Sequence, residues 1–145
     1  MGVTRSIEIG RSPEEVFAFV ADARNDPRWC PTVVACEQEG GDGPGPGARY
    51  TARHKPTPFH RVMSRSIEVL DFEAPRILRS RQEDANGVFW ITYEVEPTGG
   101  GARLTQHDEI DWKVPRVAGR FAERAFVRRH IGEQMTVLQR LLEER

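Results

Sequence analysis

Residues 115–145, PRVAGRFAERAFVRRHIGEQMTVLQRLLEER, decide the fold of this chain. Proline occurs only at the first position of this stretch, where its preset φ angle favours the first turn of a helix. Apolar residues recur at spacings of three, four and seven or more, which places one apolar stripe along a helix face: Val117, Phe121, Ile131, Met135, Leu138 and Leu142. At about 1.5 Å per residue the helix would be ~45 Å long, so it needs a broad apolar surface to lie on.

The segment before this helix supplies such a surface, because it alternates between apolar and polar residues as half-buried strands do. We expect a first strand at 3–9 and about six consecutive strands at 33–39, 48–55, 59–72, 76–83, 88–96 and 102–113. Asn86-Gly87 and the glycines at 99–101 are hairpin signals, so the sheet should be antiparallel. The sequence therefore predicts an α+β fold, with about seven strands covered by a long C-terminal helix.

Two short helices are expected between the first two strands. Ser12, Pro13 and Glu15 form a helix start, because serine caps, proline occupies the first helical position and glutamate closes a capping box. A second short turn is expected at 27–30, where it carries Trp29. Both helices are too short to cover the sheet, so they should plug one end of it.

Composition limits the class of protein. The chain has 145 residues, a net charge of -1 and no apolar run near the ~18 residues of a spanning helix. We therefore expect one domain over 1–145, cytoplasmic, with no nucleic-acid partner and no membrane span. Cys30 and Cys36 match no common metal spacing and are expected to be buried thiols, so no metal or other cofactor is predicted. Arginine greatly outnumbers lysine, which suggests a GC-rich bacterial genome.

The phrases IEIGRSPEEVF at 7–17 and NDPRWCP at 25–31 resemble the START-like, helix-grip (SRPBCC) superfamily. Within it, the chain looks most like the polyketide cyclase/dehydrase and lipid-transport group. The resemblance covers essentially the whole chain, and implies a curved antiparallel sheet that grips the last helix and leaves a cavity between them. It does not fix a reaction, because relatives include cyclases, aromatases and plain binding proteins.

Strand alternation predicts which side chains face this cavity. A curved sheet cannot contact a straight helix along its whole length, so the cavity should lie under the first half of the helix. Most inward positions are apolar with a few polar groups, which is typical of a ligand pocket. The candidate ligand-binding residues are Trp29, Tyr50, Met63, Arg65, Gln82, Phe89, Ile91, Gln106, Trp112, Phe121 and Ala125.

Three inward residues are candidates for proton transfer. Asp108 shares a face with apolar residues, so it should have a raised pKa or a cationic partner such as Arg65; it is either a structural ion-pair member or a general base. His54 could transfer a proton or lie exposed beside the prolines at 56 and 58. Tyr93 could orient a carbonyl or simply be a buried core tyrosine.

Arginines recur every four residues along the first half of the helix, at Arg116, Arg120, Arg124 and Arg128. This basic ridge is either a solvated face or a docking strip for an acidic partner, for example an acyl carrier protein. The main hypothesis is a module that binds a hydrophobic, polyketide- or lipid-like small molecule. The alternative is a polyketide cyclase or aromatase, whose acid-base residues promote aldol closure and dehydration.

Overall fold

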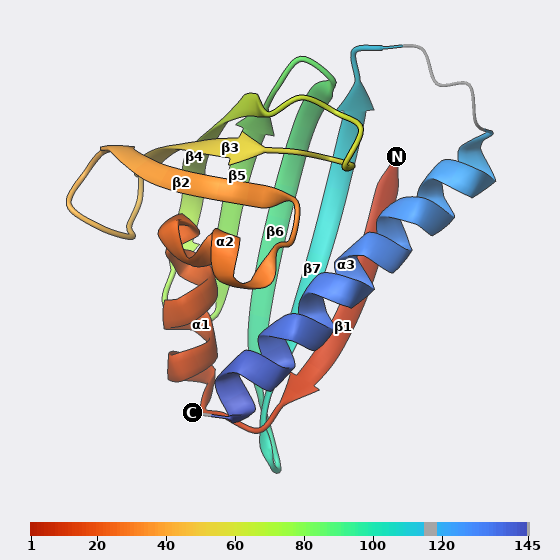
Figure 1. Cartoon of the computed structure of the whole chain (residues 1–145). Helices are drawn as coiled ribbons and strands as arrows, with labels where there is room; N and C mark the ends of the chain where they lie inside the picture. Colours follow the sequence, from red (N-terminus) through yellow and green to blue (C-terminus); the bar gives the residue numbers. More distant parts are fainter. Residues whose placement is uncertain (115–118, 145) are drawn as a thin grey trace.

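The protein forms a curved, seven-stranded antiparallel sheet that wraps one end of a long helix, as Figure 1 shows. The structure is a computed structural model that describes residues 1–114 and 119–144. The strand order is β1-β7-β6-β5-β4-β3-β2. The strands are β1 (Gly2–Ile9), β2 (Val33–Gly40), β3 (Arg49–His54), β4 (Met63–Glu73), β5 (Ile77–Glu83), β6 (Gly87–Thr98) and β7 (Gly101–Trp112). The predicted fold class, a helix-grip α+β fold, is confirmed.

The hairpin signals set the register of the sheet. Gly87 faces Trp112 and Thr98 faces Gly101, so β6 and β7 form one long ladder around the glycine turn. The predicted strand at 59–72 begins too early, because β4 starts only at Met63. Residues 56 and 58 are prolines, which lack the N–H that a ladder needs, and the chain turns at 57–60 before it re-enters the sheet.

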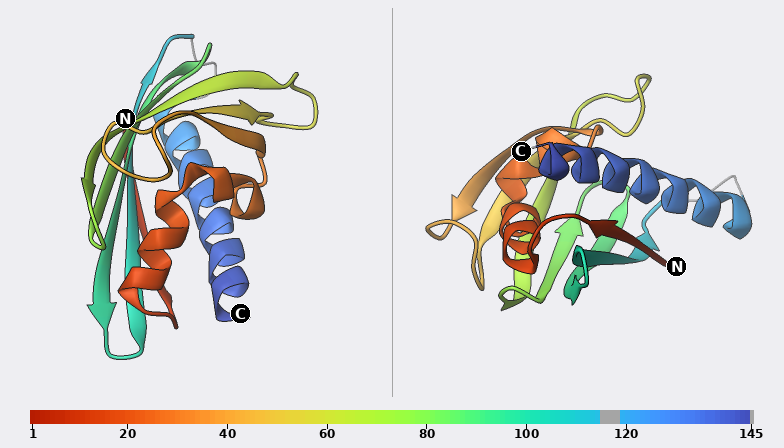
Figure 2. Two further views of the ribbon diagram at one scale, coloured as in Figure 1. Left: turned by 90° about the vertical axis from the view of Figure 1, so that its left-hand side faces the viewer. Right: turned by 90° about the horizontal axis from the view of Figure 1, so that it is seen from below.

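The short helices form where the capping signals predicted them. In α1 (Pro13–Ala21) the Ser12 side chain accepts a hydrogen bond from the Glu15 N–H, and Val16, Phe17 and Val20 are buried. A 3-10 turn, η1 (Ala23–Asn25), follows and leads directly into α2 (Asp26–Trp29). These elements sit against one end of the concave sheet face, beside the C-terminal end of the long helix (Figures 1 and 2).

The long helix, α3 (Arg120–Glu143), begins five residues later than its predicted start at residue 115, and residues 115–118 lie outside the described part of the chain. Its C-terminal half packs into the sheet through Leu138 and Leu142, while Ile131 and Met135 pack with Val3 of β1. The predicted stripe is therefore confirmed for the second half of the helix.

The predicted place of Phe121 and Ala125 on the inner wall is wrong, because Phe121 is 90 % exposed and Ala125 is also exposed. At about 100° per residue, Phe121 lies about 80° away from Ile131 around the helix axis. The first turns of α3 also extend past the sheet, beside β1 (Figure 2). Val127 points inward instead and packs against the core.

Candidate ligand-binding site

The predicted inward face of the sheet is correct from β3 to β7. Alternate residues along each strand are buried, and they include most of the proposed ligand-binding and catalytic residues. The inward positions are Tyr50, Ala52, His54, Ile67, Val69, Leu78, Ser80, Gln82, Phe89, Ile91, Tyr93, Val95, Leu104, Gln106, Asp108 and Ile110. Met63, Arg65 and Trp112 are half-buried at the end of the same face that lies away from the β6–β7 hairpin, which is called the open end below.

Gln106 and Asp108 form a polar pair on the β6–β7 part of this face, which is called the floor of the site below. They lie two residues apart on β7, and Gln106 Nε2 donates to Asp108 Oδ1 over 3.0 Å. The register places Tyr93 of β6 opposite Gln106. Gln106 is 3 % exposed, and its Oε1 has no hydrogen-bond donor among the described residues. A buried acceptor without a donor is costly, at about 1–3 kcal/mol, so this atom is a natural contact point for a bound group.

Burial also shifts the pKa values of these groups. Desolvation raises the pKa of Asp108 to about 6, and this outweighs the lowering by the Gln106 hydrogen bond and by the charge of Arg65. The pKa of the Tyr93 hydroxyl is raised well above its ordinary value, first by burial and then by the nearby carboxyls of Asp26 and Asp108. At neutral pH the floor thus holds an ionised but easily protonated carboxyl close to a neutral phenol.

Replacing Asp108 with asparagine should stabilise the protein at neutral and alkaline pH. The raised pKa means that the folded state binds the proton more tightly, so ionisation of Asp108 costs stability, with the cost absent near pH 4 and complete above about pH 6. Asparagine keeps the bond from Gln106 without the charge. We expect a gain on the order of 2 kcal/mol at about pH 8 that vanishes near pH 4, measured by urea unfolding across pH.

The exposed Asp111 on the opposite face of β7 provides the matched control. Asp111→Asn should change stability little at either pH. A gain in Asp108→Asn that does not vary with pH would contradict this account of its pKa.

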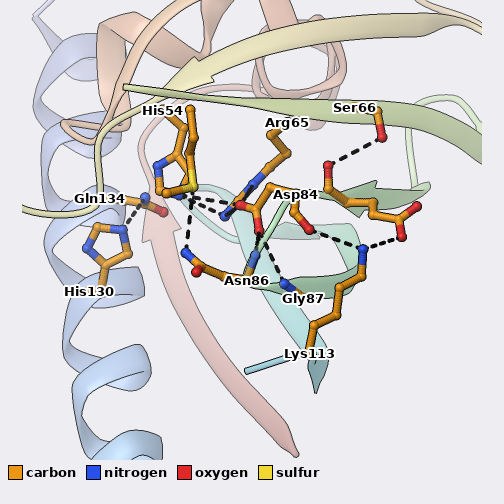
Figure 3. A network of polar contacts seen from close by, with 11 residues as sticks. His54, Arg65, Ser66, Asp84, Asn86, Gly87, Lys113, His130 and Gln134 are labelled. Atoms are coloured by element: carbon orange, nitrogen blue, oxygen red, sulfur yellow. Dashed lines mark hydrogen bonds and ion pairs between the residues drawn. The ribbon is translucent and has the colours of Figure 1, made fainter. Parts of the chain in front are cut away.

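A second polar group lies at the open end of the sheet, shown in Figure 3. Arg65 donates to Asp84 Oδ2 through Nε and Nη2, at 3.0 and 2.8 Å, and its guanidinium stacks on the Phe89 ring at 4.2 Å. Asp84 Oδ1 accepts from the backbone N–H groups of Asn86 and Gly87. The Asp84 side chain is fully buried, so these four donors hold a desolvated carboxylate in a fixed place.

His54 completes this group as a neutral imidazole. Its Nε2 lies 2.8 Å from Arg65 Nη2, and since guanidinium can only donate, Nε2 accepts and Nδ1 carries the ring proton. Burial, followed by the charge of Arg65, lowers the pKa of His54 to about 4, although Asp84 acts in the opposite direction. His54 is 8 % exposed, and its Nδ1–H has no acceptor among the described residues. The alternative that His54 lies exposed beside the prolines is therefore wrong.

α3 contributes polar groups to the same end of the site. Gln134 is buried and its Nε2 lies 3.0 Å from His130 Nε2, while the His130 ring stacks with Phe126. Burial lowers the pKa of His130, and the charge of Arg65 lowers it further. Figure 3 shows His54 lying between Arg65 and this side of the helix, so strand and helix side chains meet there.

Two residues of the site were missed from the sequence. Asp84 lies just beyond β5 and two residues before the Asn86-Gly87 turn. An aspartate in this position commonly accepts hydrogen bonds from the N–H groups of the turn, so the spacing Asp-x-Asn-Gly was the signal that could have identified it. Asp26 lies in α2 beside Trp29, and desolvation raises its pKa to about 8. Trp29 is 1 % exposed and its ring lies 6.1 Å from that of Tyr93, so Trp29 closes the end of the inward face that lies beside α2.

The basic ridge predicted on α3 makes specific contacts with the edge of the sheet. Arg124 donates to the Gly2 carbonyl at 2.7 and 3.1 Å, and Arg128 donates to the Thr4 carbonyl at 2.7 Å. These carbonyls belong to β1, which is an edge strand of the sheet. The two guanidinium groups therefore fasten the helix to this edge strand. Residue 116 lies outside the described part of the chain.

Two surface hollows lie beside β1. One, of about 570 Å³, is lined by the turn at 97–100 together with Glu8 and Glu143, and the other, of about 510 Å³, by Gly2 and Arg124 among others. Neither is the space between sheet and helix that the sequence predicts. Among the described residues, His, Cys, Asp and Glu side chains form no group that could hold a metal ion.

Comparison with known proteins agrees with this geometry. A family model described as polyketide cyclase / dehydrase and lipid transport matches residues 1–143. A protein from Thermus thermophilus superposes with a TM-score of 0.79 at 15% identity, covering 96% of this chain and 94% of its own. A START superfamily protein from Mycobacterium smegmatis superposes with a TM-score of 0.72 at 18% identity, covering 99% of this chain and 94% of its own. A protein from Mesorhizobium loti superposes with a TM-score of 0.74 at 17% identity, covering 99% of this chain and 98% of its own. No curated protein matches the sequence.

Proposed function

Because the chain belongs to the polyketide cyclase/dehydrase and lipid-transport family, we propose that it binds a hydrophobic small molecule, polyketide- or lipid-like, between the concave sheet face and α3. The observation that carries the proposal is the set of buried polar atoms left without partners on an otherwise apolar face, within the described residues. These atoms are Tyr50 Oη, His54 Nδ1 and Gln106 Oε1.

These atoms demand partners of opposite kinds. Gln106 Oε1 is an acceptor beside the Asp108 carboxylate, so it calls for a hydroxyl donor, whereas the His54 Nδ1–H calls for an acceptor such as a carbonyl oxygen. The surrounding apolar side chains include Ile91 and Phe89, which would bury the hydrocarbon part of a ligand. An aromatic hydroxyketone has a hydroxyl donor, a carbonyl acceptor and an apolar ring, and so meets all three requirements.

The first test is native mass spectrometry of protein purified from its own host. We expect a retained small molecule whose loss on denaturation leaves the mass of the bare chain. The second test compares the affinities of two matched probes, 2-naphthol and 2-methoxynaphthalene. The hydroxyl of the first can donate to Gln106 and Asp108, whereas the ether cannot, so wild type should bind the naphthol about tenfold more tightly by calorimetry.

Substitution of the acceptors should remove this preference without removing binding. In the double variant Gln106→Leu with Asp108→Leu, both naphthalenes should bind with similar affinity, because the apolar floor remains. If neither probe binds wild type and no ligand is retained, the binding proposal fails.

The second candidate function is a polyketide cyclase or aromatase, favoured by the pKa of about 6 of Asp108 beside the neutral Tyr93 phenol. A carboxylate with such a pKa can accept a proton near neutral pH, and the phenol can donate to a carbonyl oxygen. We expect Asp108→Asn and Tyr93→Phe to keep affinity for a poly-β-ketone substrate and to lose about a hundredfold or more of its turnover. His54→Ala tests the third candidate in the same assay. Affinity changes without any turnover in wild type would leave binding as the function.

A further inference from the structure

Three phenylalanine side chains project from the open end of the molecule. Phe59 is 97 % exposed, Phe121 is 90 % exposed and Phe126 is 62 % exposed. Phe59 belongs to the segment between β3 and β4, whereas the other two belong to the first half of α3. Both segments lie at the same end of the molecule in Figures 1 and 2, away from the β6–β7 hairpin. Exposed aromatic side chains on two separate segments of one end make that end a candidate interaction surface.

The turn that carries Phe59 is held by its own hydrogen bonds. The Phe59 N–H donates to Thr57 Oγ1 at 3.2 Å, and the His60 N–H donates to the Thr57 carbonyl at 3.1 Å. Thr57 Oγ1 also lies 2.6 Å from His60 Nδ1. The neighbouring Pro56 and Pro58 restrict the backbone further. Phe59 therefore projects outward from a turn whose conformation is fixed by hydrogen bonds and by the two prolines.

The first half of α3 presents a second apolar face to the surroundings. Ala122 and Ala125 are exposed together with Phe121 and Phe126, although the helix is otherwise rich in arginine. At about 100° per residue these four side chains occupy one side of the helix, away from the stripe that contacts the sheet. The described structure covers this side with no other element (Figure 2).

Basic residues gather in the same two segments. Residues 55–62 contain Lys55 and Arg61 and no acidic residue, and residues 120–130 contain four arginines and one glutamate. The two segments together therefore carry a net charge of +5, from six basic residues and one glutamate, whereas the whole chain has a net charge of -1. A surface that combines projecting aromatic groups with cationic neighbours complements an anionic lipid surface.

We propose that this end docks peripherally on an anionic lipid bilayer, with Phe59 and the exposed face of α3 entering the headgroup region. A rigid protein partner would need pockets to receive three projecting rings, whereas a bilayer deforms around them. Within the described chain, no helix is long and apolar enough to cross a membrane, which agrees with docking on its surface. Docking would place the open end of the sheet, with Arg65 and His54, against the lipid from which an apolar molecule could enter.

Sedimentation with vesicles tests the proposal. We expect binding to phosphatidylcholine vesicles that contain about one third phosphatidylglycerol, with at least about tenfold weaker binding to pure phosphatidylcholine. Moderate salt should weaken binding to the anionic vesicles. Phe59→Ser should lower the partition coefficient about tenfold, because one buried aromatic ring is lost, and Arg61→Glu about fivefold or more.

Leu70→Ser is the matched control, because Leu70 is an exposed apolar residue (38 % exposed) on β4, outside both segments. It should bind vesicles like wild type, and thermal unfolding should show that all variants fold. A second variant, Phe121→Ser with Phe126→Ser, tests the helix face separately. Equal binding to neutral and anionic vesicles would overturn the proposal. So would binding to an acidic acyl carrier protein but to no vesicle, since the surface would then be a protein interface.

Discussion

Alanine in place of Gly101 is expected to lower the free energy of unfolding by about 3 kcal/mol or more, a large effect for one methyl group. Gly101 opens β7 with a φ of 154°, a conformation that residues with a side chain rarely adopt. An added Cβ would overlap the Ile9 carbonyl oxygen and lie 2.9 Å from the Arg11 backbone nitrogen. Both neighbours are backbone atoms of the segment that leads from β1 into α1, so they cannot move away without breaking the β1–β7 ladder.

Gly100 offers the matched control, because it precedes Gly101 in the same hairpin and a Cβ there meets nothing within 4 Å. Gly100→Ala should unfold at nearly the wild-type denaturant concentration, and Gly101→Ala at a much lower one. Equal midpoints for the two variants would show that the β1–β7 edge tolerates displacement.

Replacing Arg65 with methionine should destabilise the fold by about 3–5 kcal/mol. The Asp84 carboxylate would keep its two backbone donors but lose both guanidinium bonds, and it would remain a buried charge without a counter-ion. The stacking of the guanidinium on Phe89 would also be lost. Urea unfolding at neutral pH measures the effect.

A second substitution separates the charge from the packing. Adding Asp84→Asn to Arg65→Met removes the unpaired charge, while the asparagine oxygen can still accept from the backbone N–H groups of Asn86 and Gly87. The double variant should therefore recover a substantial part of the lost stability. If it is less stable than Arg65→Met alone, charge burial is not the cause.

The local patterns of the sequence were sufficient for the order of the elements and for the inward faces of β3 to β7, although the predicted starts of β4 and α3 were too early. Side chains alternate across a strand with a fixed period, so Tyr50, Tyr93 and Asp108 could be assigned inward before any pairing was known. Ser12 and Pro13 marked the start of α1 because capping depends only on neighbouring residues. The family resemblance then supplied the helix-grip arrangement, and the family model matches residues 1–143.

Contacts between distant residues had to come from the tertiary structure. Asp84 meets Arg65 across β4 and β5, and Arg124 meets the Gly2 carbonyl 122 residues away. No local period encodes these pairs, because they depend on strand register and on where the helix crosses the sheet edge.

The sequence by itself determined the strands, their inward faces and the buried stripe of the second half of α3, since each follows from a repeat of two or about 3.6 residues. Only the tertiary structure decided that Phe121 and Ala125 are exposed, that His54 is neutral and buried, and which cation faces the Asp84 carboxylate. The reason is physical. Periodicity fixes the direction of a side chain relative to its own element, whereas burial and pKa depend on what another element brings to that side.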